Sequence, residues 1–165
     1  MKRNITHLVV HCTATAHNAP VAAILRYWED TLKWKAPGYH KIVKADGEVV
    51  TLLPDSKIAN GVAGHNKTCL HVSWIGGLHN DNRTMAQRKA LAAVLYNWLK
   101  VYPGAKICGH RDFPGVKKAC PQFDAGATYN YLKAYVAAAG EGAKLPDEPP
   151  VEPSAPGATG GAFGV

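Results

Sequence analysis

The 165-residue chain has no run of about 18 consecutive apolar residues, the length that a helix needs to cross a lipid bilayer. Its N-terminus is basic and then apolar, but the apolar run covers only Leu8–Val10. The core of a signal peptide has about 7 to 15 apolar residues, so this run is too short to be one. We therefore expect a protein that is made and folded in the cytoplasm, without a membrane span and without export through a signal peptide.

Cysteine and aromatic residues are also few. Only 8% of the residues are Phe, Trp or Tyr, and Lys and Arg do not alternate with them in a stripe, so the pattern does not favour direct nucleic-acid binding. No C-x-x-C pair occurs, which argues against a thioredoxin-like or four-cysteine zinc site. In a cytoplasmic protein, cysteines are more often free or metal-bound than joined in disulfides. The chain has four: Cys12, Cys69, Cys108 and Cys120.

The formal net charge is +7, and it is unevenly distributed along the chain. The segment after Gly140 carries one Lys and four acidic residues, a net −3, so the preceding part carries +10. A basic domain favours an anionic partner, such as nucleic acid, an acidic surface or an acidic polymer like the bacterial cell wall. Many small basic domains have no such partner, so the charge alone leaves the partner open.

The hydrophobic pattern predicts one α/β domain over residues 1–140, with a mixed central sheet flanked by helices. Asp46-Gly47 predicts a tight turn between two strands of a hairpin, and Thr84 with Gln87 predicts a helix-capping box. Asn18 is the expected N-cap of the first helix. Residues 141–165 are rich in Pro, Gly and Ala, so we expect a disordered tail. The expected strands cover 5–12, 39–44, 48–53, 69–75 and 106–109; the expected helices cover about 18–35, 84–102 and 125–139.

One stretch carries most of the polar chemistry. Residues 107–124, ICGHRDFPGVKKACPQFD, predict a short strand followed by a turn-rich loop. His110 and Cys120 in this stretch, together with His11 at the end of the first strand, are N and S ligands of the kind that zinc prefers. Three such ligands with an open fourth position are typical of catalytic zinc, although a single histidine at a strand end is usually an ordinary polar residue. Cys12 and Cys108 are alternative sulfur ligands, which we expect instead to point to the opposite face and pack in the core.

Two further residues could assist a metal in this cleft. Lys118 precedes Cys120 by two residues, and an ammonium group near zinc can stabilise an oxyanion. Tyr39 begins the predicted hairpin, and its phenol could hydrogen-bond a water molecule or the substrate. Lys118 could equally be a solvated lysine beside Lys117, and Tyr39 could equally serve packing.

Seven short segments then identify a family. Over residues 5–136 the chain resembles the type-2 N-acetylmuramoyl-L-alanine amidases, and most closely the short phage endolysins among them. The resemblance implies that His11, His110 and Cys120 bind one Zn²⁺ per chain, and that Tyr39 and Lys118 are the catalytic partners of the metal. In much of the wider family an aspartate replaces the cysteine ligand. The segments are VVHCTAT at 9–15, GYHKIVKADG at 38–47, GH at 64–65, IGG at 75–77, TMAQ at 84–87, GHRD at 109–112 and KACPQFD at 118–124.

The same resemblance gives His40 and His65 a place in the cleft wall or around the metal ligands. Two positions depart from the family pattern. His71 stands where the family usually has a small residue, and Lys41 replaces an apolar one. We expect neither change to abolish activity, although His71 could alter the packing or the floor of the cleft.

The implied function is hydrolysis of the amide bond between N-acetylmuramic acid and L-alanine in peptidoglycan, by a monomer acting in host lysis. Without a signal peptide, such an enzyme reaches the wall only after the membrane is permeabilised, for example by a holin. Two alternatives remain open at this point. One is a module of the same fold that binds peptidoglycan without cutting it; the other is a regulator that binds a phage RNA polymerase.

Overall fold

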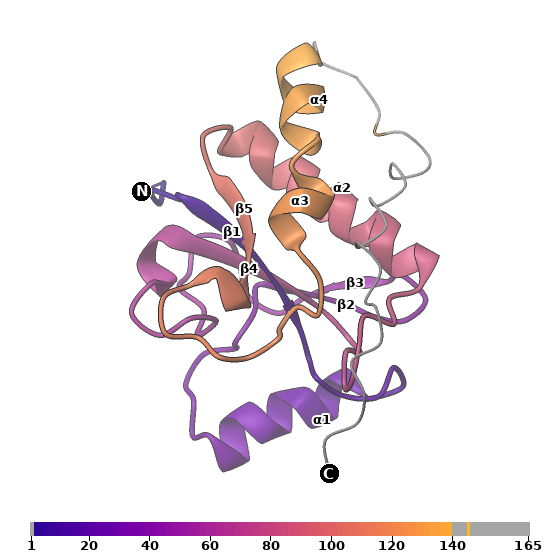
Figure 1. Cartoon of the computed structure of the whole chain (residues 1–165). Helices are drawn as coiled ribbons and strands as arrows, with labels where there is room; N and C mark the ends of the chain where they lie inside the picture. The colour runs from indigo at the N-terminus through magenta and orange to yellow at the C-terminus, as the bar shows by residue number, and fades with distance from the viewer. Residues whose placement is uncertain (1, 140–144, 146–165) are drawn as a thin grey trace.

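The structure, a computed structural model, describes residues 2–139 and Leu145. The predicted tail, 141–165, lies outside the described residues apart from Leu145. Within the described part, five strands form one sheet in the order β3-β2-β4-β1-β5 (Figure 1). The strands are β1 (His7–Cys12), β2 (Lys41–Val43), β3 (Val49–Thr51), β4 (Cys69–Trp74) and β5 (Lys106–Gly109).

The sheet is mixed, as the sequence predicted. β1 lies between β4 and β5 and is parallel to both, and β2 is parallel to the other side of β4. β3 is antiparallel to β2, to which it is joined by the predicted turn at Asp46-Gly47. Because β1 and β5 are parallel neighbours, their carboxyl ends lie at the same edge of the sheet, and His11 and His110 come from these two ends.

Helices cover both faces of the sheet, with α1 and α2 on opposite sides (Figure 1). The predicted capping box at the start of α2 is confirmed, since the Thr84 side chain accepts from the Gln87 N–H and the Gln87 side chain accepts from the Thr84 N–H, both at 3.0 Å. The α-helices are α1 (Val21–Arg26), α2 (Met85–Val101), α3 (Ala125–Tyr129) and α4 (Leu132–Ala138); α1 continues as a π-helical turn (Tyr27–Thr31), and 3₁₀ turns cover Asn66–Thr68 and His110–Asp112.

Two helix predictions need correction. The first helix is capped by Pro20 rather than Asn18, because Pro20 has an extended backbone and its carbonyl already accepts the first helical N–H bonds. This helix ends at Thr31, earlier than the predicted position near Lys35. The last helix is divided, because Lys133 N–H bonds to the carbonyl three residues back instead of four, which tightens the chain between α3 and α4.

Alternation along the strands separates an apolar face from the face that carries the site. Leu8, Val10 and Val72 belong to the core cluster that also contains buried residues of α2. Val9 and His11 alternate with them and therefore point to the other face. α1 and the π-helical turn that follows it pack against that other face beside β2, where buried Ile24 of α1 and Trp28 of the turn join Ile42 in one apolar cluster. The sheet thus delivers polar side chains to one side without exposing its main core.

No helix within the described residues is long and apolar enough to cross a membrane.

Candidate metal centre

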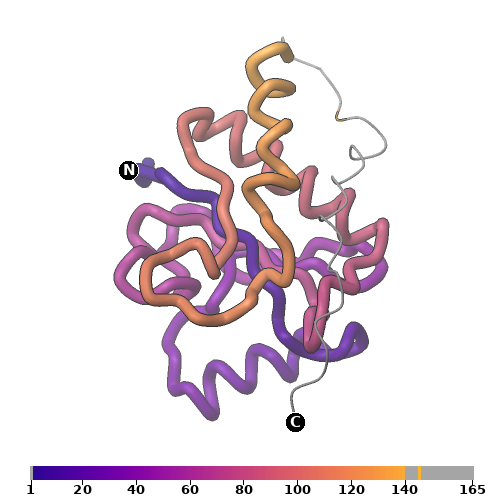
Figure 2. Tube along the Cα trace, viewed as in Figure 1, coloured from indigo at the N-terminus to yellow at the C-terminus, as the bar shows by residue number. Residues whose placement is uncertain are grey.

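The structure brings together the three residues that the sequence suggested as zinc ligands. One ligand atom from each of His11, His110 and Cys120 lies within 4.8 Å of those of the other two. His11 is the penultimate residue of β1, and His110 follows β5 directly. The loop after β5 then passes the end of β1 and carries Cys120 to it (Figure 2). Three separate stretches of chain therefore converge on one point.

His11 is fixed by contacts on both ring nitrogens. Its side chain is only 1% exposed, its Nδ1 lies 3.9 Å from Cys120 Sγ, and its Nε2 lies 3.0 Å from His71 Nδ1. Nδ1 is therefore the nitrogen that faces the cluster. Burial, followed by the neighbouring His71, lowers the pKa of His11 well below its usual value. The imidazole is accordingly neutral near pH 7, which is the form that binds a metal ion.

The loop that carries Cys120 is held close to His110. The backbone N–H of Arg111 donates to the Cys120 carbonyl at 2.9 Å, which ties the two ends of the loop together. Gly109 allows this approach, because a Cβ at that position would lie 2.5 Å from Cδ of Pro121. Position 109 of the GHRD segment therefore requires glycine, because a side chain there would push the Cys120–Pro121 segment away from β5.

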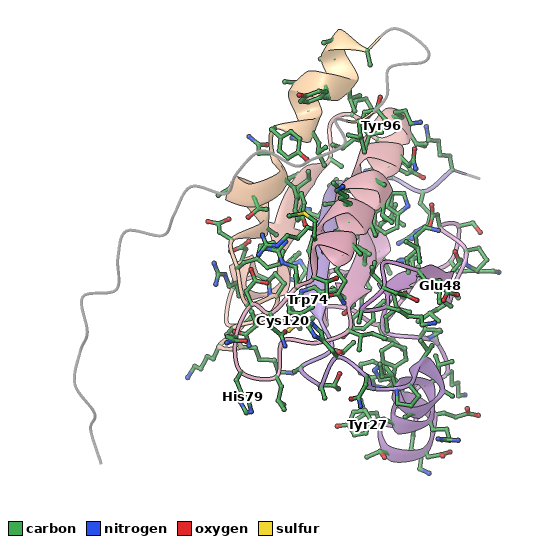
Figure 3. All side chains as sticks on the ribbon, turned by 90° about the vertical axis from the view of Figure 1, so that its right-hand side faces the viewer. Tyr27, Glu48, Trp74, His79, Tyr96 and Cys120 are labelled. Carbon is green, nitrogen blue, oxygen red and sulfur yellow. The ribbon has the colours of Figure 1, made fainter. Side chains whose placement is uncertain are left out.

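Cys120, labelled in Figure 3, is half-buried and packs against the main core cluster. The backbone N–H of Cys12 donates to Cys120 Sγ at 3.3 Å, an interaction that favours a thiolate. A hydrogen bond with the Cys12 side chain, together with burial, raises the pKa of the Cys120 thiol in the metal-free protein. Binding of a metal ion must therefore displace a proton from this sulfur.

The other candidate sulfurs lie outside the three-residue cluster. Cys12 is buried in the main core, as predicted. Cys108 is also buried, but the predicted direction of its side chain is wrong: it packs against Val9, on the same face of the sheet as His11. The reason is that Cys108 and His110 are two residues apart, so alternation does not place them on opposite faces.

Beside the cluster is a cavity of about 770 Å³ that contains both predicted catalytic partners. Its volume lies within the range of small-molecule sites, about 300–1,000 Å³. None of the described residues that line it is acidic, so the cavity favours an anionic or polar group over a cation. The lining includes Tyr27, Trp28, Trp34 and Tyr39 as aromatic walls, with His11, His110, Lys118 and Cys120 at the polar end.

Tyr39 lies directly against His11, with ring centroids 4.9 Å apart. Its hydroxyl donates to the Cys12 carbonyl at 3.4 Å and also interacts with Ser73. Burial is the main cause that raises the pKa of Tyr39, and the nearby Cys120 raises it further. The phenol therefore stays protonated at neutral pH and can act as a hydrogen-bond donor at the cluster.

Lys118 lies on the loop before Cys120, with an exposed side chain that reaches the cavity wall. After burial, the positive charge of Lys118 is the second cause that lowers the pKa of His110. The amino group is thus close enough to affect the cluster electrostatically. Lys118 and the three residues of the cluster line the same cavity.

The two remaining sequence candidates occupy different surroundings. His40 is fully buried, and its ring stacks on His71 with centroids 5.9 Å apart. His65 is exposed and contacts Phe113, with ring centroids 4.8 Å apart, and it is not among the residues that line the cavity. Of these two, only His40 is connected to the cluster, through His71.

The residue whose importance the sequence analysis underestimated is His71. The sequence marks it only as a departure from a family pattern, yet its imidazole is fully buried and touches His11. The available signal was its position: a histidine at the centre of a strand that is otherwise apolar must find a polar partner inside the protein.

The buried histidines should make the free energy of unfolding of the metal-free protein depend on pH. Burial lowers the pKa of His71 to about 3 and also lowers that of His40. In the unfolded chain these groups titrate near 6.5, so below about pH 6.5 the unfolded chain binds more protons, and for His71 this window extends to about pH 3. The free energy of unfolding should therefore fall as the pH falls through this window, by up to about 1.4 kcal/mol per pH unit for each histidine.

Urea unfolding in the presence of a chelator, at pH 7.5, 6.5 and 5.5, measures this slope. His71→Asn removes one of the buried titrating groups and should reduce the slope, whereas His79→Asn, at an exposed position, should leave it unchanged. A free energy of unfolding that stays constant between pH 6.5 and 5.5 would contradict the prediction.

Comparison with known proteins relates this chain to one family. The sequence profile of the N-acetylmuramoyl-L-alanine amidases matches residues 1–123. The endolysin of Enterobacteria phage K11 is 33% identical over 129 residues, which cover 74% of this chain and 84% of that protein. The endolysin of Escherichia phage T7 is 33% identical over 124 residues, which cover 71% of this chain and 80% of that protein.

A solved structure is similar over the same region. The Ph2119 endolysin from the Thermus scotoductus MAT2119 bacteriophage Ph2119 superimposes with a TM-score of 0.65 at 25% sequence identity. The match covers 82% of this chain and 86% of that one. The α/β architecture is therefore shared with an endolysin, in agreement with the fold expected from the sequence.

Proposed function

We propose that this chain, which belongs to the N-acetylmuramoyl-L-alanine amidase family, cleaves peptidoglycan with one Zn²⁺ held by His11, His110 and Cys120. Family membership identifies the reaction, which is hydrolysis of the amide bond between N-acetylmuramic acid and L-alanine. The phage relatives are endolysins, and the biological role is likewise lysis of a host cell. The single observation that supports the metal site is the convergence of three ligand atoms within 4.8 Å.

The donor set fits zinc. Two imidazoles and one thiolate, with space for a fourth ligand, are the arrangement that catalytic zinc prefers. Zn–N and Zn–S bonds at a tetrahedral angle separate the nitrogen from the sulfur by about 3.5 Å. The distance between His11 Nδ1 and Cys120 Sγ is 3.9 Å, close to that separation. When bound, zinc supplies a water molecule of lowered pKa and a Lewis acid for the substrate carbonyl.

In this proposal Lys118 stabilises the negative charge that develops on the carbonyl oxygen of the substrate. A preorganised positive group near a reacting carbonyl is worth far more to the transition state than to the neutral ground state. The position of Lys118 at the wall of the cavity supports the role, as does its effect on the pKa of His110.

Tyr39 is the second group that acts on the reacting atoms. Its raised pKa keeps the phenol protonated, and its single O–H, which points to the Cys12 carbonyl in this structure, would turn to donate to the attacking water or the substrate. It is held for this by its ring contact with His11 and by the edge-on ring of Trp28, at a centroid distance of 5.1 Å.

Replacement of Tyr39 by phenylalanine tests the role of the hydroxyl. The ring packing is retained, while a hydrogen bond worth about 1.5–3 kcal/mol to a charged transition state is lost. We expect kcat to fall about 10- to 150-fold, with zinc content unchanged. Tyr27→Phe is a matched control, because Tyr27 lines the same cavity but is 53% exposed. An unchanged kcat in Tyr39→Phe would remove this residue from the mechanism.

An enzyme differs from a module that only binds the wall in that it cleaves peptidoglycan. Zymography on purified peptidoglycan, with mass analysis of the released fragments, tests it. The expected products are a glycan strand with a free lactyl carboxyl group and a stem peptide with a free L-alanine amine. Zinc-loaded protein that binds peptidoglycan but releases neither product would exclude the catalytic function.

We also propose an oligomeric state, a route to the cell wall and a second partner for the chain. The chain acts as a monomer and reaches the cell wall from the host cytoplasm after the membrane has been permeabilised. A phage RNA polymerase that the chain would regulate is proposed as one additional partner, and the +10 charge of residues 1–140 is compatible with an anionic surface on it. Size-exclusion chromatography with light scattering tests the monomer, and the same measurement on a mixture with polymerase tests the complex. A single peak at the mass of a dimer would refute the first part, and the absence of co-elution would refute the second.

A further inference from the structure

His71 is the polar group that meets the rear of the proposed metal site. It lies on β4, beside β1, and its partner in the parallel register is Val9, two residues before His11. Val9 and His11 point to the same face of the sheet, as does His71, so the two imidazoles meet. His71 Nδ1 lies 3.0 Å from His11 Nε2, and both side chains are buried.

The direction of this hydrogen bond follows from the geometry of His11. Its Nδ1 faces Cys120 Sγ, and so is the atom available to a metal ion. A neutral imidazole that binds metal through Nδ1 carries its proton on Nε2. That proton needs an acceptor inside the protein, and His71 Nδ1 is the group within reach. We propose that His71 is a positioning residue of the zinc site, which accepts the Nε2–H of His11 and so selects the tautomer and ring plane in which Nδ1 can bind zinc.

His71 is itself held in the orientation that this role requires. Its backbone N–H donates to His40 Nδ1 at 3.0 Å, and the two rings are stacked with an interplanar angle of 5°. His40 Nε2 then donates to the carbonyl of Lys57 at 2.9 Å, since its Nδ1 is already an acceptor. Nη1 of Arg3 donates to the same carbonyl at 2.7 Å. A row of three imidazoles therefore runs from the ligand His11 to a network that includes an arginine near the N-terminus.

Gly61 leaves the space for the imidazole of His71. A Cβ at position 61 would lie 2.2 Å from His71 Nδ1, the atom that contacts His11. Even a methyl group at this position must displace the ring and break the contact. Gly61 and His71 thus act as a pair, in which the small residue of the loop admits the large one of the strand.

The remaining nitrogen of His71 argues against a purely structural role. With Nδ1 as acceptor, the proton resides on Nε2, and this buried atom has no hydrogen-bond partner among the described residues. An unpaired buried donor is unfavourable for folding, so an apolar side chain of similar size would serve packing at least as well. A histidine at this position is explained by what its other nitrogen does for His11.

The inference rests on the proposed zinc site and is tested by metal affinity rather than by activity. Zinc affinity is measured by chelator competition on the metal-free protein, together with its melting temperature. His71→Leu fills the space but provides no acceptor, and Gly61→Ala displaces the ring while His71 remains. We expect both to weaken zinc binding about 10- to 100-fold, the usual effect of losing the partner of a metal-bound histidine. His71→Asn keeps an acceptor near the position of Nδ1 and should stay within a few-fold of the wild type.

Val72→Ala provides the matched control for damage to the strand. Val72 is the next residue of β4, is fully buried and points to the opposite face, toward α2. This variant should lower the melting temperature and leave zinc affinity unchanged. Wild-type zinc affinity in His71→Leu would overturn the positioning role. Failure of the wild-type protein itself to bind zinc would instead refute the metal site, so the two failures are distinguishable.

Discussion

Cys120→Ala is expected to lose zinc and amidase activity together. The wild-type chain should contain about one zinc per molecule, because its three protein ligands leave one position open for water or substrate. Alanine removes the only anionic ligand of the three. Loss of a group that merely supports a metal ligand weakens binding about 10- to 100-fold, so loss of the ligand itself should exceed about 100-fold. Metal analysis after dialysis and turnover of purified peptidoglycan measure the two effects.

Two further variants make the result specific to the metal site. Cys108→Ala removes another buried thiol, which packs against Val9 outside the three-residue cluster, and should retain both zinc and activity. Cys120→Asp replaces the thiolate by a carboxylate, which is also a zinc ligand, and should recover part of the metal content. Full activity in Cys120→Ala would contradict the proposed mechanism at its centre, as would activity that survives complete removal of zinc by a chelator.

Lys118→Ala is expected to lower kcat by about 10²–10³-fold, which is the usual effect of removing one group that stabilises an oxyanion. The positive charge of Lys118 stabilises the transition state more than the ground state, because the oxygen of the substrate carbonyl becomes negative only as the water attacks. KM should therefore change much less than kcat. Zinc content should be unaffected, because Lys118 is not among the three ligand residues. Steady-state kinetics with a soluble muropeptide separates the two parameters.

The neighbouring lysine offers a control of equal charge. Lys117→Ala removes one positive charge from the same exposed loop but from a residue that does not line the cavity, so kcat should stay near the wild-type value. Equal losses in the two variants would indicate a general effect of the positive charge on binding of an anionic wall. Such a result would remove Lys118 from the catalytic step.

Much of the local structure could be predicted from sequence because it depends on neighbours along the chain. The turn at Asp46-Gly47 and the capping box of Thr84 and Gln87 each involve residues a few positions apart. The errors occurred where the same local rules competed. Pro20 replaced Asn18 as the helix cap, since its extended backbone already provides the first acceptor of the helix. A change from four-residue to three-residue hydrogen bonds divided the last helix, and no pattern of apolar residues records such a change.

The sequence by itself determined the reactive residue types, the order of the elements and the family. It could nominate His11, His110 and Cys120, although the first and last of them are 109 residues apart. Only the tertiary structure decided that their ligand atoms converge, because convergence depends on the parallel neighbours β1 and β5 and on a loop tied back to Arg111. The same dependence explains His71. Its contact with His11 comes from the pairing of β4 with β1, a relation between strands that the residues of one strand cannot specify.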